Sequence, residues 1–285
     1  MKRTILAVAV SLLSLTLCEG QTERTFEKTL NVSGPVTLDL VTDAGGIRVT
    51  RGEPGVVRVR GILKAQRGWW VSGGGNAEDK IRQLERNPPI EQSGSTVRVG
   101  YVTDKSLLKG VSMRLEIVTP PESELRARTD SGGISVDGIK GPVDCKADSG
   151  GIEANNIDSD VHVGTDSGGI HIRAIRGSVY ARADSGGIEA QDIAGAIDVA
   201  TDSGGIHLSQ TRPAPVRARA DSGGARLTLA RAGGYDLKLH SDSGRISTPE
   251  MTVHGKISQH NVEGSVRGGG PRVEIDVDSG NIDID

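Results

Sequence analysis

Apolar and polar residues alternate along most of this chain of 285 residues, the pattern of β-strands with one buried face. Residues 77–87 (AEDKIRQLERN) predict a helix instead, and it is stopped by Pro88 and Pro89. The clearest alternation in the first 120 residues covers 26–50, 56–64, 96–102 and 113–118. We therefore expect residues 21–120 to form an irregular, β-rich capping section that carries one short helix.

From residue 121 onward the alternation is organised by a repeated phrase, Asp-Ser-Gly-Gly-Ile. Its aspartates recur every 18 residues, at Asp130, Asp148, Asp166, Asp184 and Asp202. Degenerate copies follow at Asp221, Asp242 and Asp278, with steps of 19, 21 and 36, the last of which we interpret as two periods; an outlying copy stands at 43–47. A fixed period this short predicts a solenoid, in which a coil buries its apolar face only by stacking on its neighbours.

The apolar positions lie at fixed offsets from each aspartate. Offsets 4, 9 and 13 are Ile or Val in almost every copy, as in Ile170, Ile175 and Val179. Offsets 4 and 6 share a parity, as do 13, 15 and 17, so each coil contains two short strands with alternate side chains inward. A large residue at offset 6 usually accompanies a small one at offset 15, which places the two across a thin core. The prediction is an all-β parallel β-solenoid of 18-residue, two-strand coils over residues 121–285.

The beginning of the chain is typical of a secretory signal. Lys2 and Arg3 precede the apolar run 5–17, which is too short to span a bilayer, and residues 1–20 form the expected leader. Cys18 is a candidate lipid anchor. We expect an exported protein of the periplasm, cell envelope or cell surface, without a transmembrane segment once the signal is removed.

Composition narrows the possible functions. The 34 basic and 37 acidic residues give a net charge of -3, which indicates no nucleic-acid partner. Cys145 is the only cysteine after the leader, so we expect a buried small residue and no disulfide. Trp69 and Trp70 are expected to cover the open end of the core. The short coils leave little room for a cleft, no catalytic motif or cofactor signature is found, and a polysaccharide-active enzyme is the least favoured class.

The repeated aspartates are the first candidate site. In register they would stack like charges about 4.8 Å apart. The favoured interpretation is a turn in which Asp and Ser accept backbone N–H groups and the glycines supply positive φ. The alternative is a calcium-binding repeat module, because stacked carboxylates suit a hard cation. The candidate ligands are Asp130, Asp148, Asp166, Asp184 and Asp202.

A second candidate comes from the residues that differ between copies. Offset 5 alternates between acid and imidazole with a 36-residue period, in Glu153, His171, Glu189 and His207. These four side chains would form an outward ladder. Ordinary cross-strand pairing explains such a ladder better than a zinc site does, because no third type of ligand is fixed nearby. We expect this ladder to be the binding face, if the array binds a partner along its length.

The chain also resembles a known family, the adhesin-like proteins of bacteria with a DUF4097-type domain. The resemblance rests on the proline-rich step into the array (PPESELRARTDSGGISV, from Pro120) and on the closing repeats (VEGSVRGGGPRVEIDVDSGNIDI, from Val262). It implies a β-solenoid fold and a role at the cell envelope or surface, and it supplies no catalytic residues. The expected function is that of an exported, non-enzymatic scaffold or binding module for an envelope or surface partner, protein or glycan.

Overall fold

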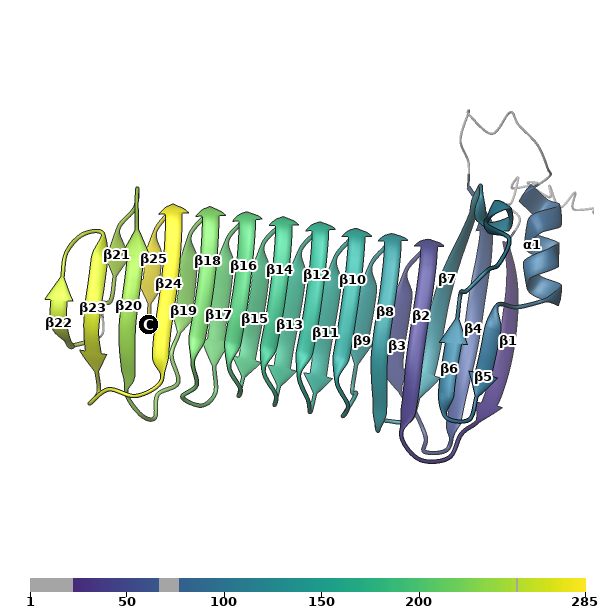
Figure 1. The fold of residues 1–285 in the computed structure, drawn as a ribbon, viewed down its shortest axis with the longest axis horizontal. Helices are drawn as coiled ribbons and strands as arrows, with labels where there is room; N and C mark the ends of the chain where they lie inside the picture. Colours follow the sequence, from purple (N-terminus) through teal and green to yellow (C-terminus); the bar gives the residue numbers. More distant parts are fainter. Residues whose placement is uncertain (1–22, 67–76, 250) are drawn as a thin grey trace, which may run out of the picture.

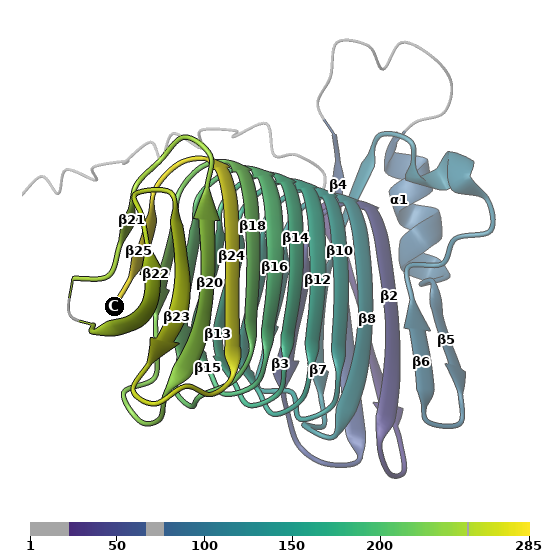
Figure 2. The ribbon, with the colours of Figure 1, turned by 60° about the vertical axis from the view of Figure 1, so that its left-hand side comes forward.

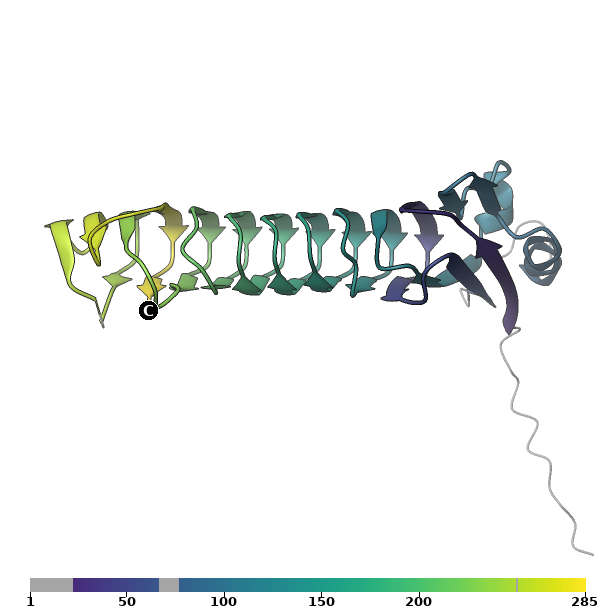
Figure 3. The same cartoon turned by 90° about the horizontal axis from the view of Figure 1, so that it is seen from below.

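Two long β-sheets packed face to face make up most of the molecule (Figures 1 and 3). The computed structural model describes residues 23–66, 77–249 and 251–285. Within these residues one sheet has 12 strands and the other has 13. The predicted leader 1–20, the candidate anchor Cys18 and the pair Trp69 and Trp70 lie outside the described residues. Both sheets extend along the long axis of the molecule. The face of each sheet that points away from the other sheet is exposed to solvent.

The middle of the molecule is a regular stack of coils. In the 12-stranded sheet its strands are β9 (Ile134–Asp137), β11 (Ile152–Ile157), β13 (Ile170–Ile175), β15 (Ile188–Ile193), β17 (Ile206–Gln210) and β19 (Ala225–Thr228). In the 13-stranded sheet they are β8 (Ser123–Ser131), β10 (Val143–Ser149), β12 (Val161–Ser167), β14 (Val179–Ser185), β16 (Ile197–Ser203) and β18 (Val216–Ser222). Successive coils pair in parallel and in register, as Ile152 with Ile170 and Ile170 with Ile188. The predicted β-solenoid of two-strand coils is confirmed.

The inward positions are those that the offsets predict. Ile170, Ile175 and Val179 are each at most 2% exposed. Ala154 and Val163, examples of offsets 6 and 15, are also buried, on strands of opposite sheets. The thin interior between the sheets is therefore filled by small aliphatic side chains, which bury enough apolar surface only because coils lie on both sides of each one.

The alternation of Thr and Ala just before each aspartate also belongs to the interior. Thr165 and Thr201 are buried, and their hydroxyl groups donate to the backbone oxygens of Gly150 and Gly186, at 3.0 and 2.9 Å. A buried hydroxyl requires such a partner, and here the partner is the turn of the preceding coil. The Thr and Ala part of the 36-residue alternation therefore lies in the core and is not exposed on the outer face.

The first coil of the stack comes from the opening section. β2 (Val36–Ala44) and β3 (Ile47–Arg51) lie parallel to β8 and β9, with Ile47 opposite Ile134. The outlying copy of the repeat at 43–47 is therefore a genuine coil.

Five strands with both parallel and antiparallel pairing, together with one helix, close this end of the described molecule. β1 (Glu23–Asn31), β4 (Val56–Ala65) and β7 (Val111–Thr119) extend the 12-stranded sheet, and β5 (Ile90–Ser93) and β6 (Thr96–Val99) extend the other. The helix α1 (Ala77–Arg86) packs on β1 and β4 and buries Ile81 and Leu84, and a 3₁₀ turn, η1 (Lys105–Leu108), precedes β7. This one-helix cap shares a continuous hydrophobic core with the array.

The other end departs from the order of the sequence. After β19 the chain forms β20 (Tyr235–Ser241), β21 (Ile246–Ser247) and the hairpin β22 (Val253–Ile257) and β23 (Asn261–Val266). It then returns, and β24 (Arg272–Ser279) lies between β18 and β20, while β25 (Ile282–Ile284) lies between β19 and β21 (Figures 1 and 2). The step of 36 residues is therefore not two stacked periods, because the coil of Asp278 stacks directly on that of Asp221. The final strand is paired on both sides.

Candidate functional site

The predicted Glu/His ladder exists as a row on the outer face of the 12-stranded sheet. Glu153 pairs in register with His171, His171 with Glu189, and Glu189 with His207. Nδ1 of His171 lies 3.2 Å from a carboxylate oxygen of Glu189. Their side chains point to solvent because residues at offsets 4 and 6, on either side, are buried in the core.

The row continues beyond the repeats in both directions. Register pairs carry it across the sheet in the order Glu27, Arg60, Glu116, Arg48, Ser135, Glu153, His171, Glu189, His207, Arg226 and Asp283. Arg60 forms ion pairs with both Glu27 and Glu116, at 3.2 and 3.3 Å, and Arg226 lies 3.4 Å from Asp283. We call these 11 residues the charged row. Acidic residues alternate with Arg or His along most of its length, and a histidine such as His171 carries a charge only when protonated. The ladder seen in the repeats therefore belongs to a row that crosses 11 of the 12 strands.

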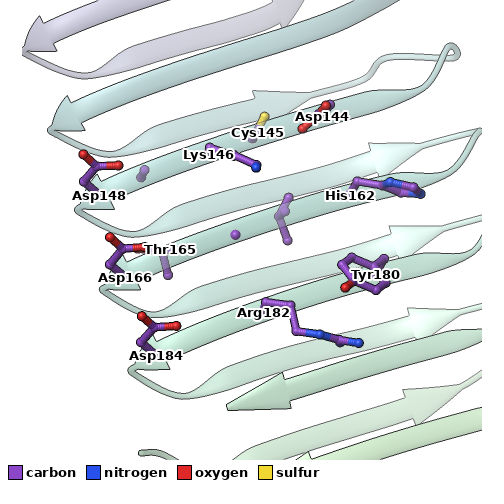
Figure 4. Close-up of a pocket in the computed structure, with 13 residues that line it drawn as sticks. Asp144, Cys145, Lys146, Asp148, His162, Thr165, Asp166, Tyr180, Arg182 and Asp184 are labelled. Carbon is purple, nitrogen blue, oxygen red and sulfur yellow. The ribbon is translucent and has the colours of Figure 1, made fainter. Parts of the chain in front are cut away.

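The repeated aspartates form a second row, along one corner of the solenoid. The strands on either side keep them in line, since Ala147 pairs with Thr165 and Ser149 with Ser167. Figure 4 shows Asp148, Asp166 and Asp184 side by side at this corner. All five aspartates of the regular copies are exposed. In the part of the chain that the structure describes, no group of three or more His, Cys, Asp or Glu side chains is placed to hold a metal ion.

The turn at this corner is made by backbone groups rather than by the Asp and Ser side chains. The N–H of Gly132 donates to the carbonyl oxygen of Ser149 in the next coil at 2.8 Å, and the same bond recurs along the stack. Gly150 has a φ of 143°, and a Cβ there would lie 2.1 Å from the oxygen of Gly132. The expectation that Asp and Ser accept the turn N–H groups is therefore wrong, because neighbouring coils already satisfy them. The expected positive φ is confirmed at the first glycine of the pair.

A third feature, which the sequence patterns left unnoticed, lies on the outer face of the 13-stranded sheet. It is a shallow depression of about 470 Å³ at Gly164, with Lys146 and Arg182 on the neighbouring strands (Figure 4). His162 and Tyr180 line one side, and the aspartate corner lines the other. We call it the Gly164 depression. Gly164 occupies offset 16, where the flanking coils have Lys146 and Arg182, so the missing side chain is what opens the hollow.

Contacts with a neighbouring ring and with Arg182 hold the aromatic side of the Gly164 depression in place. The centroids of the His162 and Tyr180 rings lie 5.7 Å apart, and the guanidinium carbon of Arg182 lies 4.1 Å from the Tyr180 ring centroid. Arg182 in turn donates to Oδ1 and the backbone oxygen of Asp198, at 2.7 and 3.1 Å. Tyr180 still exposes 42% of its surface. The ring is thus fixed, with one face covered by Arg182, and the part that stays exposed can contact a ligand.

Cys145 is among the residues at the depression, but it is buried at the floor of the hollow. Its side chain is fully buried, and this burial raises the pKa of the thiol far above its usual range. A thiol that remains protonated is a poor nucleophile. The expectation of a buried, unreactive small residue agrees with this environment.

Comparison with known proteins identifies the family. The family model Toastrack DUF4097 matches residues 123–285. This chain belongs to that family, as its resemblance to adhesin-like DUF4097 proteins predicted.

Two solved structures are similar over most of the chain. A "putative adhesin" from Bacteroides fragilis is 12% identical, with a TM-score of 0.48, and the match covers 92% of this chain and 97% of that one. A "putative cell adhesion protein" from Clostridium sporogenes is 13% identical, with a TM-score of 0.27 and coverage of 92% and 99%. No curated protein matches the chain. Among the described residues no helix has the length and apolar character needed to cross a membrane.

Proposed function

We propose that the protein is an exported, non-enzymatic binding module or scaffold of the cell envelope or cell surface. The observation that carries this proposal is the charged row. It places side chains at a regular spacing along 11 strands of the 12-stranded sheet, so a partner with complementary charges can be held at many points at once. The adhesin-like family and the leader expected at residues 1–20 support the same location.

The middle of the charged row is the proposed contact surface. Glu153, His171, Glu189 and His207 lie about 4.8 Å apart on a regular part of the sheet. Each exposed charge contributes little on its own because solvent screens it. A row of them gives specificity through register, because a partner whose cations are displaced by one strand no longer lies opposite Glu153 and Glu189.

Export is tested by expressing the full chain with an epitope tag after residue 285 and fractionating the source organism. The tagged protein is expected in the periplasmic, envelope or surface fraction. Recovery only from the cytoplasm would contradict the proposal.

Binding is tested by co-sedimentation of the purified protein with isolated envelopes of the source organism. Saturable pelleting that falls as salt rises is expected, because charged contacts are screened. Treatment of the envelopes with protease or with periodate tells a protein partner from a glycan. The absence of pelleting at low salt would contradict a binding role.

A further inference from the structure

We propose that the Gly164 depression is a saccharide-binding site for a neutral or amine-bearing sugar unit. It lies on the 13-stranded sheet, away from the charged row, and goes beyond the function proposed above. Gly164 itself supports this proposal. A glycine within a strand loses more backbone entropy on folding than alanine does and has no side chain to pack, so its presence needs a reason.

The fold does not supply that reason. A Cβ added at Gly164 would come no closer than 3.9 Å to its nearest neighbour, the backbone oxygen of Arg182, and its φ lies outside the positive region. The corner glycines of the repeat are different, since a Cβ at Gly150 would collide with backbone. Gly164 has room for a side chain that it does not have. A mid-strand glycine of this kind marks a place where a ligand approaches the backbone closely.

The walls of the depression suit one ring of a sugar. Lys146 and Arg182 stand two strand spacings apart, about 9.6 Å, with the exposed Tyr180 ring beside them. The C–H groups of a pyranose can pack against the part of that ring that Arg182 leaves uncovered, and its hydroxyl groups can bond with the ammonium of Lys146 and the carboxylate of Asp166. The volume of about 470 Å³ falls within the ~300–1,000 Å³ usual for small-molecule sites.

The charges around the depression select among sugars. Four carboxylates line it, those of Asp144, Asp148, Asp166 and Asp184, against the two cations of Lys146 and Arg182. Arg182 is already paired with Asp198. The surplus of negative charge opposes a uronic acid or a sulfated sugar and favours a neutral or protonated amino sugar.

The test is titration of the purified full chain with three oligosaccharide probes, followed by calorimetry and by NMR. The probes are a neutral N-acetylglucosamine oligomer, an amine-bearing glucosamine oligomer and an acidic galacturonate oligomer. Binding of the neutral or the amine-bearing oligomer, and not of the acidic one, is expected. Binding of neither, or of the acidic oligomer alone, would overturn the proposal.

Two pairs of variants locate the site. Gly164→Arg fills the hollow with the residue type found at Arg182 and should fold, so at least a tenfold weaker affinity is expected. Ala200→Arg makes the same addition at the same offset outside the depression and should bind as the wild type does. Tyr180→Ala should weaken binding and Tyr180→Phe should preserve it. Unchanged affinity in Gly164→Arg with an intact fold would overturn the assignment.

The outcome is separable from that of the proposed function. Glu153→Lys/Glu189→Lys alters only the charged row, so it should retain the affinity for the sugar probe. Sugar binding without any envelope binding would contradict the function proposed above and leave this site standing.

Discussion

The regular stack and the C-terminal end are built from the same kind of coil, yet they are assembled differently. From β8 to β19 the order of coils in space follows the order in the sequence, with steps of 18 or 19 residues between aspartates. At the C-terminal end, β20 and β21 do not pair with β18 and β19, the strands of the preceding coil. The chain forms a hairpin and returns, and β24 and β25 pair between these two coils. Identical local patterns therefore specify a coil without specifying its neighbour. The steps of 21 and 36 residues mark where the order changes.

The largest effect is expected from a charge inside the regular stack. Ile170→Asp places a carboxyl group in an aliphatic interior with coils on both sides, and should cost about 4 kcal/mol or more of unfolding free energy. Denaturant unfolding followed by circular dichroism measures the loss. His171→Asp, one residue away on the outer face, is the control and should cost far less. Equal stability of Ile170→Asp and the wild type would show that the inward register is wrong.

Removing the inserted coil of β24 and β25 should destabilise the C-terminal end more than the regular stack. Ending the chain after Pro271 removes β24 and β25, so β20 loses the strand that joins it to β18. Hydrogen exchange should then show lost protection in β20–β23 and retained protection in β10–β16, since a solenoid coil depends mainly on its neighbours. Asp283→Asn, which keeps the inserted coil, is the control. Unchanged protection in β20–β23 would contradict the out-of-order topology.

Relieving backbone strain at Ala174, in the regular stack, should stabilise the protein by a smaller amount. Ala174 has a φ of 57°, a conformation that the equivalent residue of another coil, Gly138, adopts at little cost. Ala174→Gly should therefore raise the unfolding free energy by about 0.5–1 kcal/mol, as measured by thermal or denaturant melts. Ala200→Gly, in ordinary strand conformation, should lower it by a similar amount. Destabilisation by both changes would contradict the strain assigned to Ala174.

The smallest effect concerns pH at the C-terminal end. The ring nitrogens of His240 each lie 2.8 Å from an oxygen, one of Asn261 on β23 and one of Asp242. Hydrogen bonds to Asn261 and then to Asp242 raise the pKa of His240. A raised pKa in the folded state means that this contribution is complete below pH ~6.5 and is lost as pH rises through the folded value.

The size of that contribution is modest because His240 is close to solvent. After screening, at most ~0.5 kcal/mol is expected. The melting temperature of His240→Gln should therefore fall further below that of the wild type at pH 5 than at pH 8. A larger difference at pH 8 would contradict the assigned protonation.

The sequence patterns predicted the coil better than the ends or the surface. Side-chain parity is enough to place Ile170 and Val179 inward, because a strand has only two faces. It is also enough to align Glu153 with His171, since equal offsets meet in a parallel stack. The bonds of the corner were not predictable from residue types, because the partners of the turn N–H groups are backbone oxygens that every residue has. The place of β24 depends on which long connection closes, and no local pattern encodes that.

The Gly164 depression had a signal that parity alone does not reveal. Offset 16 carries Lys146, Gly164, Arg182 and Ala200, and Gly164 is the member of this set that has no side chain. Glycine is common in this chain, so the sequence alone did not single out Gly164; the structure shows that a Cβ there would come no closer than 3.9 Å to its nearest neighbour. The same holds for Tyr180, whose exposure depends on how its neighbours pack.

The charged row is the surface proposed to bind the envelope. The most direct measurement is co-sedimentation of Glu153→Lys/Glu189→Lys with isolated envelopes, beside Asp236→Lys/Glu263→Lys, which changes the net charge equally on the other sheet. At least a tenfold loss of affinity is expected in the first variant and little change in the second. Equal binding by the two variants would show that the charged row is not the contact surface.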